Sequence, residues 1–454
     1  MNKSISLLAM AGLFLAAPAR AQEEDPAQPE AVVTAASKAH SPEDASALPG
    51  MAAKPAAAPA AKLSLKDAEW DFLKATAASA DKDVLAAVLP QVEDWLAIRP
   101  AAPESHEAQL LKASLRARLG DYKAVFTDIY RHLYEYPGAP SAAEAKKLLE
   151  ETAEKKADKK IKPALFELAS VSETGDTPAR LAVMLDKVST LAGDYLYEPL
   201  LAEYRSFFVR FPDFAGGDML LLSLADLHRR EGEYLPARLA YGKMIGMYPA
   251  SPLLARAKVA LASTLADNIK DYDGAIAAFQ DIAAVFPGTA EAWTAYTRLP
   301  ALAERRKNFG LAVQVYEKII ELYPDRAEAY SSFNAEARVL REDLKDPAAA
   351  MKTLGRLADK YKGERAVEAL FLAAEIARKD LKDPSEETQV YDRIVAEYPA
   401  DPAAPKALFA AGEALEKIKD YERARDYYST MIGKYAEDPL SKKAQKRIDG
   451  LLAR

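Results

Sequence analysis

The chain has 454 residues, half of them apolar and 28% charged, which is enough apolar sequence for a packed core. Its net charge of −7 argues against a broad nucleic-acid-binding surface. The absence of cysteine excludes disulfides, thiolate catalysis and a lipid anchor on cysteine.

The first residues have the pattern of a secretory signal peptide. They combine a positive charge at Lys3, an apolar stretch over residues 5–17 and a small-residue cleavage pattern that ends at Ala21. An uncleaved membrane anchor is the alternative, but the apolar stretch is shorter than the roughly 20 residues that span a bilayer. We therefore expect residues 1–21 to be removed on export, to the periplasm or alternatively out of the cell, with no transmembrane span left.

Residues 22–62 are rich in Ala, Pro, Glu and Ser, as in the stretch PGMAAKPAAAPAAK. They contain almost no large apolar residue, so folding them would bury too little surface to offset the entropy lost on ordering. We expect a disordered, semi-extended tether.

The part of the chain from 63 to 454 repeats with a period of about 37–38 residues, and a fixed period of this length indicates a repeat array. An aromatic residue followed by proline marks the repeats. The positions of these prolines, 137, 212, 249, 287, 324 and 399, differ by 75, 37, 38, 37 and 75, so the larger gaps are one period doubled. The pairs are Tyr136-Pro137, Phe211-Pro212, Tyr248-Pro249, Phe286-Pro287, Tyr323-Pro324 and Tyr398-Pro399.

Apolar residues before each mark recur at steps of three and four. In one unit they are Tyr272, Ala275, Phe279 and Ile282, a stripe typical of an amphipathic helix that the following proline ends. A first helix is predicted after each mark. The fold predicted for this part is an all-α solenoid of about ten helix pairs, the third of which, over about residues 138–174, is the least regular.

Two finer features can be predicted from the same stretch. Ser141 with Glu144, and Asp325 with Glu328, have the spacing of capping boxes at the starts of first helices. The longer of the units carry one further residue between helices, near Asn268 and near Asp343.

The second-helix pattern resembles the tetratricopeptide (TPR) repeat. An aromatic residue, alanine three residues later, an aromatic residue four after that and proline twelve after the alanine all match at Tyr272, Ala275, Phe279 and Pro287. The family period is 34 residues, so each unit here is longer by about one helical turn. The long period and the Tyr-Pro mark look like bacterial envelope TPR proteins, namely the Tol-Pal accessory protein and the lipoprotein of the outer-membrane barrel-assembly machine.

No catalytic or cofactor motif is recognisable. The histidines share no metal-ligand spacing, and no phosphate-binding loop, dinucleotide fingerprint or zinc-protease motif occurs. We expect no enzyme, no cofactor and no metal site.

The resemblance implies a peptide-binding groove along the first helices. The family's inward positions, transferred onto these repeats, select the candidate groove residues Arg229, Arg230, Arg256, Arg305, Asn334, Arg338 and Arg341. Guanidinium groups bind carboxylates through paired hydrogen bonds, so this strip is suited to an acidic or C-terminal peptide segment. The alternative is that these arginines pair with neighbouring Asp and Glu, or lie on the opposite face.

These features together predict a non-catalytic, protein-binding scaffold or adaptor of the bacterial cell envelope. Peripheral association with the outer membrane or the cell wall is a further expectation. Two alternatives stay open from the sequence: a helical accessory subunit of a cell-wall lytic or secretion machine, and a self-assembling structural protein.

Overall fold

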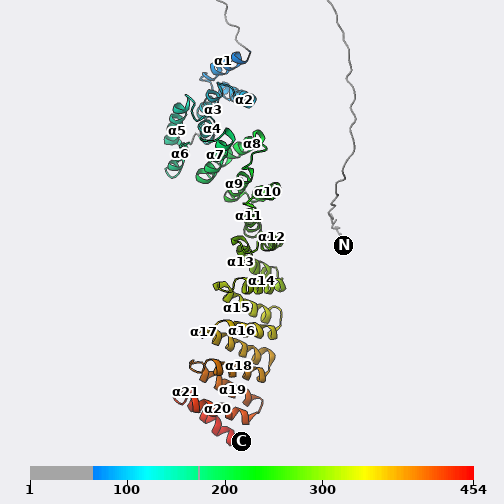
Figure 1. Ribbon diagram of the computed structural model, residues 1–454. Coiled ribbons are helices and arrows are strands. Elements are labelled where there is room, and N and C mark those ends of the chain that lie inside the picture. The colour runs from blue at the N-terminus through cyan, green and yellow to red at the C-terminus, as the bar shows by residue number, and fades with distance from the viewer. Residues whose placement is uncertain (1–64, 172–173, 454) are drawn as a thin grey trace, which may run out of the picture. The chain divides into compact units, whose positions relative to one another are not determined.

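The computed structural model describes residues 65–171 and 174–453, so the predicted signal peptide and tether lie outside the described residues. The elements in these ranges are helices, 21 of them α-helices (Figure 1). The first helices of successive pairs are α1 (Leu65–Ala77), α3 (Ser105–Leu119), α5 (Ala142–Lys156), α7 (Thr177–Ala192), α9 (Gly217–Arg230), α11 (Leu254–Thr264), α13 (Ala290–Arg305), α15 (Ala327–Glu342), α17 (Glu364–Ile376) and α19 (Ala404–Lys417).

The second helices are α2 (Lys82–Ile98), α4 (Tyr122–Glu135), α6 (Lys162–Leu168), α8 (Tyr197–Arg210), α10 (Tyr234–Met247), α12 (Tyr272–Val285), α14 (Phe309–Leu322), α16 (Pro347–Lys360), α18 (Pro384–Glu397) and α20 (Tyr421–Lys434). The helix α21 (Pro439–Leu452) follows the last pair, and two short π-helices, η1 (Leu265–Ile269) and η2 (Ala377–Leu381), extend α11 and α17.

Helices that are neighbours in the sequence pack against each other. Between α9 and α21, each helix contacts the next, and some first helices, such as α11 and α13, also contact each other directly. This arrangement confirms the predicted all-α fold of TPR-like helix pairs.

The aromatic residue of each mark caps the second helix that it ends. From α8 to α20 these helices are all 14 residues long. They begin at positions 197, 234, 272, 309, 347, 384 and 421, which differ by 37 or 38. The amide of Tyr248, for example, donates to the carbonyl of Met244 at 3.0 Å. Proline has no amide hydrogen and so stops the helix at most of these marks. After α16 and α20, where Lys362 and Ala436 follow the aromatic residue, the helix ends at the same place without proline.

Seven of the turns from a first to a second helix share one left-handed residue. Lysine occupies it at five turns, with φ between 54° and 66°, and glycine occupies it at Gly120 and Gly232. An acidic residue usually follows as N-cap, as at Asp271, whose carboxylate accepts a hydrogen bond from the amide of Gly274 at 2.9 Å. Asn268, near which an extra residue is predicted, lies in η1. Near Asp343 the turn between α15 and α16 spans residues 343–346, one residue more than the turn between α13 and α14 at 306–308.

The third pair departs from the regular pattern. Its second helix, α6, has only seven residues, and α7 and α8 pack directly on α4. α5 and α6 lie beside α4 in Figure 1. As a result α4 is covered on more sides than the other second helices, and Tyr130 and Tyr134 are buried on it.

The capping-box predictions are wrong. The N-cap of α15 is Arg326, which makes no side-chain cap, so Asp325 does not start the helix. Ser141 is the N-cap of α5, but its hydroxyl makes no bond to the amides of that helix because it is held between two histidines, described below.

Candidate functional site

The candidate groove residues all lie on first helices. Arg229 and Arg230 end α9, Arg256 lies on α11, Arg305 ends α13, and the remaining three are on α15. The transfer from the family therefore placed all seven on the same class of helix. It did not identify their partners.

Most of these arginines are paired with carboxylates of a neighbouring repeat. Arg256 lies 3.5 Å from Asp226 of α9, and Arg338 lies 2.7 Å from Glu304 of α13. Arg341 approaches Asp380 of η2 at 2.7 Å and Glu375 of α17 at 3.5 Å. Arg447 on α21 makes contacts of the same kind, to Glu413 and Glu416 of α19.

The other candidates also have partners. Arg229 contacts Asp226 at 3.8 Å, and Arg230 contacts Asp194 at 3.4 Å. Arg305 stacks over the ring of Tyr272 at 4.5 Å. The amide of Asn334 donates to the carbonyl of Tyr330 at 3.4 Å. An acidic ligand would therefore have to compete with internal carboxylates for these side chains.

A larger opening lies between two first helices nearer the C-terminus. This groove, which we call the α17–α19 groove, has a volume of about 1060 Å³. Val367, Phe371 and Leu372 of α17, Tyr391 of α18 and Ala403 before α19 supply its apolar lining. Phe371 and Tyr391 pack with their ring centres 5.8 Å apart, and Leu372 is 44% exposed. The groove thus offers apolar contact area that the fold leaves uncovered.

Charged residues surround the apolar floor. Glu364, Glu368, Glu375 and Asp401 line the groove together with only two cations, Arg378 and Lys406. Beneath the floor, burial first and the charge of Glu387 second raise the pKa of Tyr391 to about 12, so its hydroxyl stays neutral. The groove can bind an apolar side chain of a partner, and its charged rim can orient the charged residues on either side of that side chain. The residues that line it do not bring a nucleophile and a base together.

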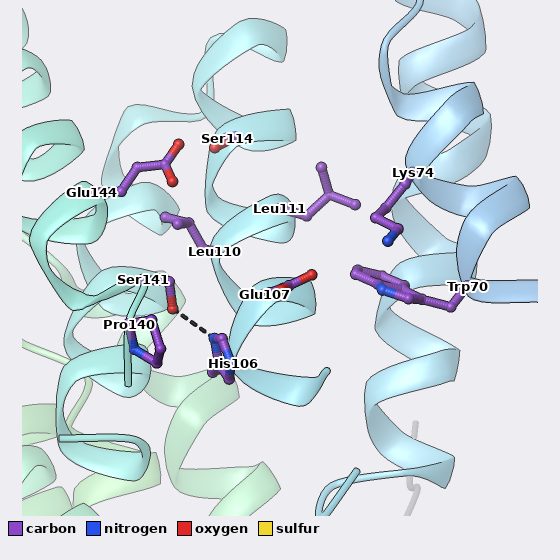
Figure 2. Close-up of a pocket in the computed structure, with 10 residues that line it drawn as sticks. All are labelled: Trp70, Lys74, His106, Glu107, Leu110, Leu111, Ser114, Pro140, Ser141 and Glu144. Atoms are coloured by element: carbon purple, nitrogen blue, oxygen red, sulfur yellow. Dashed lines mark hydrogen bonds between the residues drawn. The ribbon is translucent and has the colours of Figure 1, made fainter. Parts of the chain in front are cut away.

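A smaller cavity of about 430 Å³ lies against α1, α3 and α5, also first helices (Figure 2). At its edge the Ser141 hydroxyl lies 2.7 Å from Nδ1 of His106 and 2.7 Å from Nε2 of His132. His132 is buried, and burial first, then the nearby His106, lowers its pKa to about 4. This cluster links α3, α4 and the start of α5, and the lowered pKa keeps His132 neutral within it.

The described residues contain no group of three or more His, Cys, Asp or Glu side chains that is placed to hold a metal ion. Within residues 65–171 and 174–453, none of the helices combines the length and apolarity needed to cross a bilayer.

Sequence reasoning missed both cavities and the histidine cluster. In the sequence, Ser141 follows His106 by 35 residues and His132 by 9 residues, and only the stacking of α3, α4 and α5 brings the three together. For the arginines a signal did exist, because Glu304 precedes Arg338, and Glu375 follows Arg341, by 34 residues, close to one repeat period.

Comparison with solved structures finds several proteins at low similarity, one of them described as a tetratricopeptide repeat protein. A tetratricopeptide repeat protein from Parabacteroides merdae is 12% identical with a TM-score of 0.29, over 67% of this chain and 97% of that one. PilW, a type IV pilus biogenesis factor, is 14% identical with a TM-score of 0.27, over 52% of this chain and 100% of its own. Yeast Tom70 is 16% identical with a TM-score of 0.23, over 85% and 88% of the two chains. Likeness at this level carries no functional information about the chain.

No curated protein sequence matches the chain. A family model does match its C-terminal half in three segments, at residues 259–327, 335–402 and 400–439, and these begin at α11 and end at α21. Together with the helix pairing, this match shows that these segments of the chain are tetratricopeptide repeats.

Proposed function

We propose that the chain is a non-catalytic, protein-binding scaffold of the bacterial cell envelope, and that partner segments bind along the side lined by its first helices. The observation that supports this most is the α17–α19 groove, an apolar floor with a charged rim between consecutive first helices. Helix-pair arrays commonly bind partners on the surface that their first helices line.

In this proposal an apolar side chain of the partner packs against Val367, Phe371 and Leu372. Burying one such side chain contributes about 1.5–3 kcal/mol, and the charges of the rim select the flanking residues of the segment. The arginines of α9 to α15 are a secondary site, because an acidic segment must first displace Asp226 or Glu304 from them.

The envelope location rests on the sequence alone, through residues 1–21 and 22–62. A direct test is to fractionate the producing cells and sequence the N-terminus of the protein that they export. The proposal expects the protein in the periplasm with Gln22 as its first residue. Recovery in the cytoplasm with Met1 or Asn2 at the N-terminus would overturn it.

Binding can be tested by capture from envelope extract with the mature chain and three variants. Leu372→Glu places a charge in the groove, Arg338→Ala with Arg341→Ala removes two of the arginines, and Gln389→Glu changes an exposed residue of α18. The proposal expects the same partner with the parent and with Gln389→Glu, and its loss with Leu372→Glu. Loss with the arginine variant alone would move the site to α15. Equal capture by all four proteins would contradict a site on the first-helix side.

A further inference from the structure

The second helix α10 differs from the other regular second helices in its outward side. Its exposed residues include Leu235 at 63%, Leu239 at 74% and Met247 at 55%, while Ala237, Tyr241 and Met244 face the core. α10 is therefore apolar on both sides, a pattern that a helix facing only water does not need.

The spine of this outward side is Leu235, Leu239, Gly242 and Gly246, which are the second, sixth, ninth and thirteenth residues of the helix. In α8, α12, α14, α16, α18 and α20, the same four positions include at least one charged residue. Examples, in that order, are Glu198, Asp273, Glu317, Lys352, Asp392 and Glu422. Only α10 has a spine without charge among these seven helices.

The two glycines have no role within the described fold. A Cβ atom built on Gly242 or Gly246 would meet no atom within 4 Å, and neither residue has positive φ. Alanine would be the better helix former at both positions. Glycines four residues apart on one helix face, however, let a second helix approach closely.

The charges on α10 itself are all positive, and the exposed Glu233 caps its start. α10 is the only second helix in the described residues without Asp or Glu, and it carries Arg238 and Lys243. Arg238 and Lys243 have no carboxylate partner among the described residues, and neither has Arg205 on the neighbouring α8. Most arginines of the fold do have one. Lys243 instead lies over the ring of Phe208. An acidic partner is the complement of such a surface.

We propose that this outward side of α10 is a second protein-binding surface, and that its partner is an amphipathic helix whose apolar stripe is bordered by Asp or Glu. Apolar side chains of the partner lie against Leu235 and Leu239, its backbone approaches at Gly242 and Gly246, and its carboxylates pair with Arg238 and Lys243. The surface lies on a second helix, so it is separate from the groove of the first helices and does not depend on it.

Two other occupants fit less well. In a second copy of the chain, Arg238 and Lys243 would meet the same cations of its partner. An anionic membrane would satisfy the cations and leucines, but lipid gains nothing from two glycines in the C-terminal half of the surface.

The test uses the full mature chain and two synthetic helical peptides, one with leucines at helical spacing flanked by glutamates, the other with lysines replacing those glutamates. Fluorescence anisotropy at low salt should show the acidic peptide binding at least about 10-fold more tightly. Leu239→Glu, at an exposed position, should weaken that binding at least about 10-fold. Equal binding of both peptides, or binding unaffected by Leu239→Glu, would overturn the proposal.

A second variant separates binding from folding. Gly242→Ala with Gly246→Ala should raise the thermal stability and still weaken the acidic peptide several-fold, because the added methyl groups hold its backbone away. The matched control is Gly433→Ala, at the thirteenth position of α20, which should raise stability and leave binding unchanged. Unchanged binding in the double variant would overturn the claim that the partner's backbone approaches closely at Gly242 and Gly246.

A membrane and a second copy of the chain, the other two possible occupants, would each give a different experimental result. Flotation with phosphatidylglycerol vesicles that Leu239→Glu abolishes, without binding of the acidic peptide, would assign the surface to a membrane. Concentration-dependent dimerisation in sedimentation that Leu239→Glu abolishes would assign it to a second copy. Either result would overturn the proposal while leaving the proposed function of the first-helix side untouched.

Discussion

At the scale of single residues, glycine has opposite effects at two kinds of position in this chain. Gly120 ends α3 with φ of 92°, in the left-handed region, whereas Gly433 lies within α20 at a position where an added Cβ meets nothing. A residue with a Cβ atom is less stable than glycine in the left-handed conformation of Gly120, and more stable than glycine in the helical conformation of Gly433.

We therefore predict that Gly120→Ala destabilises the fold by about 1 kcal/mol and that Gly433→Ala stabilises it by about 0.5–1 kcal/mol. Urea denaturation of both variants beside the parent measures the two differences. Five lysines adopt the same left-handed turn with φ of 54–66°, so the cost at Gly120 should stay in this small range. Equal shifts of the same sign would show that backbone conformation does not decide these effects.

His132 gives the fold a dependence on acid. Its pKa in the native state is about 4, below the ordinary histidine value of about 6.5, so the native state binds fewer protons than the unfolded chain. Its contribution to stability is complete above pH 6.5 and is lost as the pH falls toward 4, by on the order of 3 kcal/mol in total.

The variant His132→Gln removes this titration. We expect it to be less stable than the parent at pH 7.5, because it changes a buried contact to Ser141, and we expect the difference to shrink by pH 5. Unfolding free energies of both proteins across this pH range test it. A difference that stays constant with pH would rule out His132 as the titrating group.

At the scale of helices, a buried charge cluster joins the first two pairs. Asp128 of α4 is fully buried and lies 3.0 Å from Lys112 and 3.1 Å from Arg116 of α3, and both cations also approach Glu93 of α2. Removing one partner of a buried group of charges leaves the others uncompensated.

Asp128→Ala should accordingly cost about 3–5 kcal/mol, whereas Glu93→Ala, at a partly exposed position, should cost about 1 kcal/mol or less. Denaturation monitored in the N-terminal pairs, for example by fluorescence of the packed Trp70 and Trp95, compares the two. Similar costs for both substitutions would contradict the role of burial.

A helix could be predicted from the sequence where a local pattern of residues marks it, and could not where its position depends on contacts with distant helices. The second helices from α8 onward could be placed because each ends at an aromatic residue before proline or at its equivalent. The packing of α7 and α8 on α4 could not be predicted, because it results from the short α6 and not from a local sequence pattern. Ser141 was assigned to a cap because the spacing to Glu144 is local, while its histidine partners belong to other helices.

At the scale of the whole molecule, the described array should behave as a series of units coupled to their neighbours. Leu408 and Leu415 of α19 and Tyr428 of α20 form one apolar cluster with Ala444 and Leu451 of α21. Helix α21 thus covers the last pair, as a terminal cap does in a repeat protein.

Removal of residues 439–454 should uncover this cluster and loosen the last pair first. We predict that hydrogen exchange accelerates in α19 and α20, while α12 to α15 exchange at the parent rate. Faster exchange throughout the array would indicate that the repeats unfold as one cooperative unit instead.

The central claim is that the first-helix side binds a protein partner, and photo-crosslinking in the producing cell tests it most directly. A photoreactive p-benzoylphenylalanine is placed at residue 372, in the α17–α19 groove, or at residue 389, exposed on α18 of the same pair. The account predicts that position 372 crosslinks to another polypeptide and that position 389 does not. No adduct at position 372, or the same adducts at both positions, would contradict it.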